Sequence, residues 1–110
     1  MIDLIELRRK ELNEACKKFN VERLYVFGSA TDGRFNPAAS DVDFLVTLAD
    51  RQPTGKYADR YLGLAESLEN IFGRRVDLLS EHSVRNPLLM AHIRKTRQLV
   101  YEQPNASTPR

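Results

Sequence analysis

Two closely spaced aspartates are the residues of this sequence best suited to catalytic chemistry. Asp41 and Asp43 stand at the head of an apolar run, Phe44 to Leu48. Residues two apart in a strand point to the same face, so we expect the two carboxylates to project together. Their mutual repulsion would leave one of them protonated unless a cation offsets the charge. Oxygen ligands of this kind favour a hard divalent ion, Mg²⁺ or Mn²⁺.

A glycine–serine pair upstream of the aspartates predicts an anion-binding corner. Gly28 and Ser29 follow an apolar strand directly, and a spacer over residues 30–40, rich in Gly, Asn, Pro and Ser, leads to Asp41. Glycine lets backbone N–H groups approach an anion closely, and a helix start near Ser29 would add the positive end of its dipole. The Ser29 hydroxyl can donate to the same phosphate oxygens. A phosphate cradle beside a metal-binding carboxylate pair is typical of a nucleoside triphosphate site.

Two further charged residues are candidates for the same site. Asp77 lies within the apolar strand pattern RRVDLLS, where an isolated acid is disfavoured unless it has a partner. A salt bridge with Arg74 or Arg75 would explain it, and so would a role as third metal ligand or general base. The upstream carboxylate pair favours the catalytic interpretation. Arg34 lies in the spacer, where a phosphate contact competes with a solvated loop charge.

The motif as a whole resembles that of the DNA polymerase β-like nucleotidyltransferase superfamily. The short chain looks like its minimal nucleotidyltransferase (MNT) branch, the MntA-type antitoxins that are paired with HEPN-domain toxins. The resemblance spans residues 1–102 and rests on five residues, Gly28, Ser29, Asp41, Asp43 and Asp77. It implies an α/β (α+β) fold: a single palm-like domain with a mixed sheet of three or four strands and helices mainly on one face.

The resemblance also implies a reaction and a partner. We expect Mg²⁺- or Mn²⁺-dependent transfer of AMP from ATP to a tyrosine hydroxyl of a HEPN toxin, which is neutralised within a hetero-oligomer. The expected metal ligands and catalytic residues are Asp41, Asp43 and Asp77. The expected phosphate-binding residues are Gly28, Ser29 and Arg34. Two alternatives remain open: an antitoxin that masks the toxin without catalysis, and a small-molecule nucleotidyltransferase similar to aminoglycoside-modifying enzymes.

The elements that must position these residues are helices and strands mixed along the chain. Apolar residues at three- and four-residue steps predict helices, and short apolar or alternating runs predict strands. Asn86, followed by Pro87, is a helix start signal, and Gly73 stands where a helix should end. The expected order is helix 3–19, strand 21–27, strand 44–48, helix 56–72, strand 74–79, helix 86–95 and strand 98–101, followed by a frayed tail over 103–110.

Composition narrows the class of protein further. A chain of 110 residues with 42% hydrophobic and 29% charged residues fits one soluble globular domain, expected over 1–102. Its 17 basic residues are interspersed with 15 acidic ones, so no basic stripe indicates direct nucleic-acid binding. A single cysteine, Cys16, excludes an internal disulfide and suits a reducing compartment. Neither a signal peptide nor a membrane-spanning run is evident, so we expect no membrane association and a cytoplasmic location.

Overall fold

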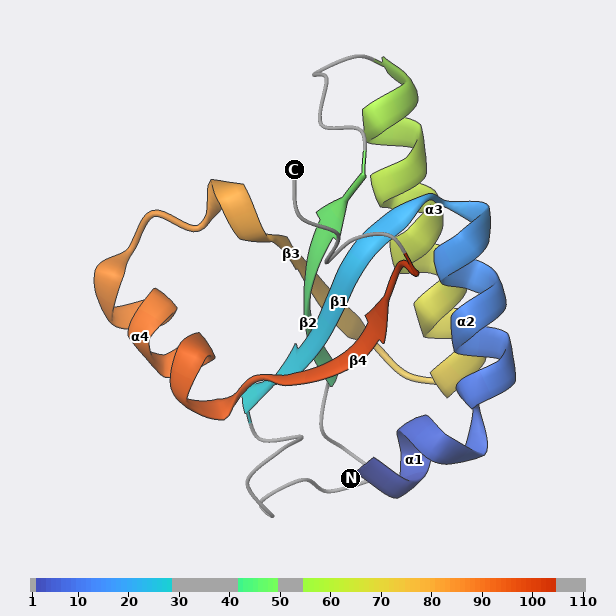
Figure 1. Cartoon of the computed structure of the whole chain (residues 1–110), viewed down its shortest axis with the longest axis horizontal. Helices are drawn as coiled ribbons and strands as arrows, with labels where there is room; N and C mark the ends of the chain where they lie inside the picture. Colours follow the sequence, from blue (N-terminus) through green and yellow to red (C-terminus); the bar gives the residue numbers. More distant parts are fainter. Residues whose placement is uncertain (1, 29–41, 50–54, 105–110) are drawn as a thin grey trace.

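Helices pack around one mixed four-stranded sheet (Figure 1). The computed structural model describes residues 2–28, 42–49 and 55–104. The elements in chain order are α1 (Ile2–Leu7), α2 (Arg9–Lys18), β1 (Val21–Phe27), β2 (Val42–Leu48), α3 (Gly55–Phe72), β3 (Val76–Ser80), the 3₁₀-helix η2 (Glu81–Ser83), α4 (Pro87–Thr96) and β4 (Gln98–Glu102). Apart from the first helix, each expected element is present, with its ends displaced by at most two residues.

The sheet has the strand order β3-β2-β1-β4, which confirms the expected mixed topology. Strand β1 pairs antiparallel with β2 and with β4, whereas β2 and β3 are parallel. Parallel strands that follow one another need a crossover connection, and α3 supplies it. This crossover places the N-terminal ends of β2 and β3, where the aspartates stand, at the same end of the sheet.

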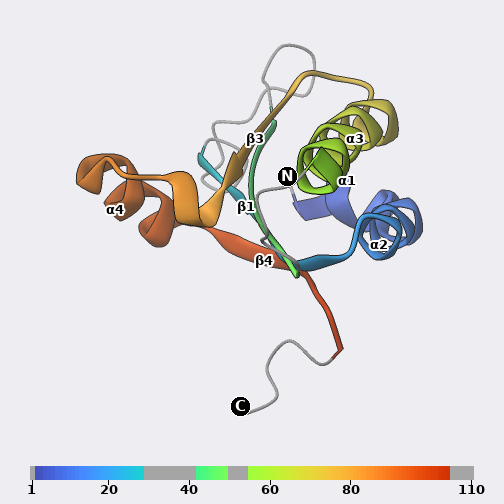
Figure 2. The same ribbon diagram turned by 90° about the horizontal axis from the view of Figure 1, so that it is seen from above.

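Two of the longer helices, α2 and α3, cover one face of the sheet, and α4 lies on the other (Figure 2). The larger core lies beneath α2 and α3; its fully buried members include Leu12, Cys16, Leu24, Val26, Phe44, Val46, Leu64 and Leu68. Burial raises the pKa of the Cys16 thiol to about 12, so this cysteine serves packing rather than reactivity. The second face has a smaller cluster of Phe27, Leu45 and Ile93. Helices therefore lie mainly on one face, as expected.

The first helix differs from the expectation, because the range 3–19 is divided into α1 and α2. The break lies at Arg8, whose φ of −114° and ψ of 20° are not helical. Its N–H donates to the Ile5 carbonyl at 3.1 Å, a bond that spans three residues and tightens the turn. Ile5 and Leu12 are both fully buried, so the apolar spacing continues across the break and does not reveal it.

Helix ends follow the capping signals of the sequence. The Asn86 side chain accepts hydrogen bonds from Leu88 N–H at 2.9 Å and Leu89 N–H at 3.3 Å, which confirms the predicted start of α4. Gly73, with a φ of +65°, follows the last residue of α3, as a C-terminal glycine should. Asn20 has a φ of +56° and ends the helical region before β1. No helix in the described ranges has both the length and the apolarity needed to cross a bilayer.

The outer edge of β3 is blocked by side chains. Val76 N–H donates to Glu69 Oε2 at 3.3 Å, and the Tyr61 hydroxyl donates to the Leu78 carbonyl. Burial raises the pKa of the Tyr61 hydroxyl above its ordinary value. An edge strand with open N–H and C=O groups invites pairing with another chain. These contacts make strand addition at β3 unfavourable.

Candidate active site

The sheet brings two of the predicted catalytic aspartates side by side. Asp43 of β2 and Asp77 of β3 are register partners in the parallel pair. Neighbouring strands lie about 4.8 Å apart, and paired residues project from the same face. Val42 and Phe44, which flank Asp43, point into the larger core, so both carboxylates lie on the opposite face, the one that carries α4. Asp41 lies outside the described residues.

The two carboxylates line a groove of about 530 Å³. Its walls also include Tyr61 from α3, together with Leu89 and His92 from α4. Asp43 is half-buried and Asp77 is exposed, so both can be reached from the groove. Two adjacent carboxylates with open access fit a hard divalent cation, which would offset their repulsion. The part of the chain that the structure describes contains no cluster of three acidic, histidine or cysteine side chains, and the predicted third ligand, Asp41, falls outside that part.

The structural alternative for Asp77 was an ion pair with a neighbouring arginine. Among the described residues, no ion pair joins Asp77 to Arg74 or Arg75. Arg74 Nε instead donates to the Phe72 carbonyl at 3.3 Å. Within the described ranges, therefore, no ion pair with a neighbouring arginine explains this exposed acid, which lines a groove beside a second acid. Its role as ligand or base remains a prediction.

Gly28 stands directly beside Asp43 because Phe27 and Asp43 are paired in β1 and β2. Its φ of +75° is a conformation that other residues rarely adopt, and a Cβ there would lie 2.8 Å from Asp43 Oδ2. The Gly28 N–H donates to Thr96 Oγ1 at 3.1 Å. The Gly28 N–H was expected to approach a phosphate, but in the structure it is already bonded to Thr96. The absence of a side chain at Gly28 allows the Asp43 carboxylate to lie against the backbone at this corner.

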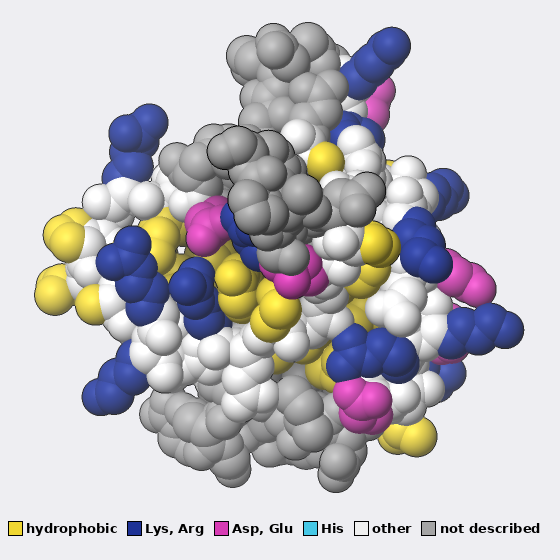
Figure 3. All heavy atoms as spheres, in the orientation of Figure 1, with side chains coloured by type: hydrophobic (Ala, Val, Ile, Leu, Met, Phe, Trp, Pro, Cys, Tyr) yellow, Lys and Arg dark blue, Asp and Glu magenta, His cyan; other side chains and the backbone are white. Residues whose placement is uncertain are grey.

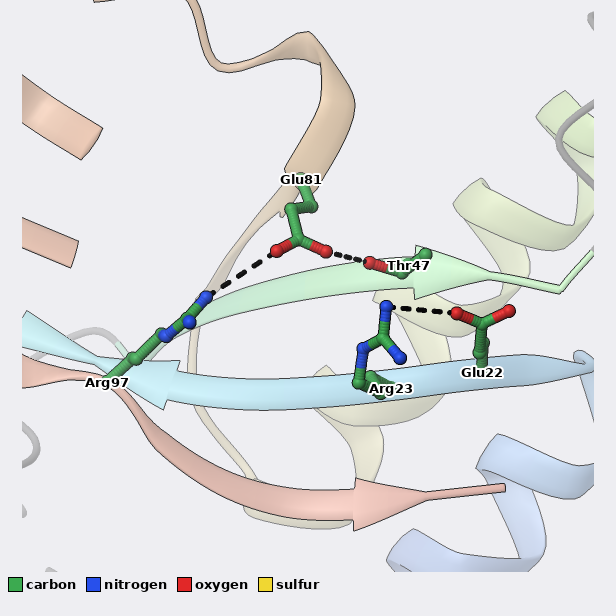
Figure 4. Close-up of polar contacts among 5 residues, drawn as sticks. All are labelled: Glu22, Arg23, Thr47, Glu81 and Arg97. Carbon is green, nitrogen blue, oxygen red and sulfur yellow. Dashed lines mark hydrogen bonds and ion pairs between the residues drawn. The ribbon is translucent and has the colours of Figure 1, made fainter. Parts of the chain in front are cut away.

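Helix α4 is joined to the sheet and to η2 at its C-terminal end, by residues that sequence reasoning missed. Thr96 accepts from Gly28 and donates to the His92 carbonyl at 3.0 Å. Before the helix begins, Glu81 accepts a hydrogen bond from the Thr47 hydroxyl, and Arg97 Nη1 lies 3.5 Å from Glu81 Oε2 (Figure 4). These bonds hold α4 as a wall of the groove. The residues that form these bonds are far apart in the sequence, and the order of the strands brings them together. No local sequence pattern encodes that order.

His92 of α4 is exposed, and its side chain lines the groove with the two aspartates. The groove was not visible in the sequence because it depends on how α4 lies over the sheet. Ser29 and Arg34, the other predicted phosphate-binding residues, lie outside the described residues, and the helix start expected near Ser29 lies there as well.

A family model described as a nucleotidyltransferase domain matches residues 9–100, most of the chain. The chain belongs to the nucleotidyltransferase family. This confirms the resemblance seen in the sequence and the class of enzyme. A curated protein of Methanocaldococcus jannaschii, named "Putative protein adenylyltransferase MJ1379", is 31% identical over 99 residues, which cover 90% of this nucleotidyltransferase and 94% of the relative.

Solved structures share the fold of this nucleotidyltransferase. The structure of a "putative minimal nucleotidyltransferase" is 27% identical, with a TM-score of 0.63 and coverage of 87% of this chain and 92% of the other. A chain of a toxin–antitoxin crystal structure with AMP-PNP is 19% identical, with a TM-score of 0.63 and coverage of 88% and 75%. A chain of the tri-AMPylated Shewanella oneidensis HEPN toxin in complex with MNT antitoxin is 18% identical, with a TM-score of 0.61 and coverage of 89% and 72%.

The contact between Thr96 and Gly28 makes a testable prediction for this nucleotidyltransferase. Thr96→Val keeps the shape of the side chain but leaves the buried Gly28 N–H without its acceptor, at a cost of about 1–3 kcal/mol. We expect a lower free energy of unfolding by that amount in urea and weaker ATP binding by calorimetry. Thr96→Ser retains the hydroxyl and should resemble the wild type. Equal losses in both variants would show that the hydroxyl is not the operative group.

Proposed function

We propose that this nucleotidyltransferase transfers AMP from ATP to a tyrosine hydroxyl of a HEPN-domain toxin and thereby neutralises it. The observation that carries the proposal is the pair of carboxylates, Asp43 and Asp77, in an open groove beside Gly28. Support comes from the relative named as a protein adenylyltransferase and from shared folds in complexes that hold AMP-PNP or an AMPylated HEPN toxin. Because the reaction consumes ATP, we place it in the cytoplasm.

In this proposal the residues divide into two groups. Asp41, Asp43 and Asp77 hold Mg²⁺ or Mn²⁺, which supplies Lewis-acid stabilisation of the charge that develops on the phosphoryl oxygens. Gly28, Ser29 and Arg34 bind the β- and γ-phosphates, and the side chains of Ser29 and Arg34 provide donors.

The transfer itself is a displacement at the α-phosphorus of ATP. Asp77 accepts the proton of the acceptor hydroxyl, because it is the exposed carboxylate of the pair. The hydroxyl oxygen then forms a bond to the α-phosphorus, the bond to the bridging oxygen breaks, and pyrophosphate leaves. Most of the rate enhancement would come from positioning and charge rather than from a covalent intermediate.

The test uses the purified protein, a HEPN-domain protein from the same genome, and ATP labelled at the α-phosphate. With Mg²⁺ we expect label on the HEPN protein, mass spectrometry to locate it on a tyrosine, and loss of the toxin's activity. Chelation with EDTA should abolish labelling. Silencing of the toxin without label would instead support an antitoxin that acts by masking. Label on a small acceptor alone would support a small-molecule nucleotidyltransferase.

A further inference from the structure

The groove that contains Asp43 and Asp77 has walls from two helices of different charge. Helix α3 carries both signs along its length: Lys56, Asp59, Arg60, Glu66 and Glu69. The segment that contains α4 and its flanks has no acidic residue between Glu81 and Glu102. Its basic residues are Arg85, Arg94, Lys95 and Arg97. A macromolecular acceptor whose hydroxyl reaches the carboxylates therefore meets a positive surface on one side only.

Helix α4 also exposes apolar surface on its outer side. Ile93 is fully buried against the sheet, whereas Leu88 is 81% exposed. Leu88 and Lys95 are seven residues apart, so they lie on the same side of the helix, away from Ile93. Figure 3 shows hydrophobic side chains flanked by lysine and arginine at the end of the molecule where α4 lies. We call Arg85, Leu88, Arg94 and Lys95, all of them exposed, the α4 ridge.

The ridge is suited to a protein partner rather than to a nucleic acid or a second copy. A nucleic acid would gain little from an exposed leucine, and the net charge of the whole chain is only +2. Two copies meeting ridge to ridge would bring three like charges from each chain together, which costs free energy. Pairing along β3 is disfavoured because Tyr61 and Glu69 occupy its outer edge. The remaining occupant is a protein with an apolar surface and an acidic rim.

We propose that the α4 ridge is the docking surface for the acceptor protein, through an apolar patch bordered by acidic side chains. This inference rests on the proposed function and adds the surface that selects the substrate. The bond from Gly28 to Thr96 and the bond from Arg97 to Glu81 hold the C-terminal end of α4 in place before the partner arrives. A prearranged ridge loses little conformational entropy on binding, which favours affinity. Docking there places the acceptor hydroxyl over the groove, because Leu89 and His92 of the same helix line it.

The experiment compares two ridge variants with two matched controls. Leu88→Glu and Lys95→Glu alter the ridge; Leu7→Glu, at a leucine 77% exposed on α1, and Lys10→Glu, at an exposed lysine of α2, make the same changes elsewhere. We expect the ridge variants to raise the dissociation constant for the HEPN protein, and the KM for it, by about tenfold or more. Affinity for Mg²⁺-ATP and the urea midpoint should stay at the wild-type values. The control variants should leave all four quantities unchanged.

The outcomes separate this inference from the proposed function. Wild-type protein that binds the HEPN protein but does not label it contradicts the transfer reaction, and the binding measurements still test the ridge. Ridge variants that bind and label like the wild type overturn the inference and leave the reaction intact. Ridge variants that weaken ATP binding, RNA binding or self-association instead, measured by calorimetry, fluorescence anisotropy and sedimentation, also overturn it.

Discussion

Replacing Asp77 with asparagine is expected to lower the rate of AMP transfer by about three orders of magnitude, or roughly 4 kcal/mol of transition-state stabilisation. The amide has nearly the same size but cannot carry the charge that a divalent ion needs. Because the Asp77 side chain is exposed, folding should be unaffected. Asp43→Asn should have a similar effect, since the two carboxylates are paired in register. Single-turnover labelling of the HEPN protein measures the rate.

A control for this prediction is available on α3. Asp59 is exposed and does not line the groove, so Asp59→Asn should transfer AMP at the wild-type rate. Calorimetric titration of ATP in the presence and absence of Mg²⁺ adds a readout that a purely structural role would not change. If Asp43→Asn and Asp77→Asn keep the wild-type affinity and its dependence on Mg²⁺, the assignment of the metal ligands is wrong.

Phe44→Ala is expected to lower the free energy of unfolding by about 3–5 kcal/mol. Phe44 is fully buried, and its ring centroid lies 5.8 Å from that of Phe72 in a stacked arrangement. Truncation leaves a cavity between β2 and α3, and domains of this size have only about 5–15 kcal/mol of stability. Urea unfolding followed by circular dichroism measures the change.

The matched control for the core is Leu62→Ala, at a leucine 65% exposed on α3. It should cost less than about 1 kcal/mol, because little apolar surface is removed from the interior. A loss of less than about 1 kcal/mol for Phe44→Ala would mean that the site collapses around the smaller side chain, contrary to the tight packing expected of a core.

The elements of this fold were predictable because their signals are local. Alternation around Phe44 indicated a strand with one buried face, and Asn86 and Gly73 marked helix ends through backbone chemistry that involves only near neighbours. The break at Arg8 escaped prediction because apolar spacing continues across it. The mixed sheet was expected from the order of the elements, but no local pattern specified that β1 would lie between β2 and β4.

The candidate site was also predictable only where its signals are local. A carboxylate within an apolar strand is energetically unfavourable unless it has a partner, so the sequence alone marked these aspartates as candidate site residues. The structure places Asp43 beside Asp77. Their roles as ligands remain predictions. Thr96 carried no signal, since a threonine near a helix end is ordinary until the sheet places it beside Gly28, 68 residues earlier in the chain. The bridge from Thr47 to Glu81 is equally non-local.

The position of β4 has a consequence for how the protein is made. Strand β4 follows α4 in the sequence, yet it pairs with β1, which is made much earlier. Chains emerge from the ribosome N-terminus first, so β1 has no partner on this side until β4 has been made. Thr96, which lies just before this strand in the sequence, reaches Gly28 at the same stage. The glycine corner and this side of the sheet are therefore completed together.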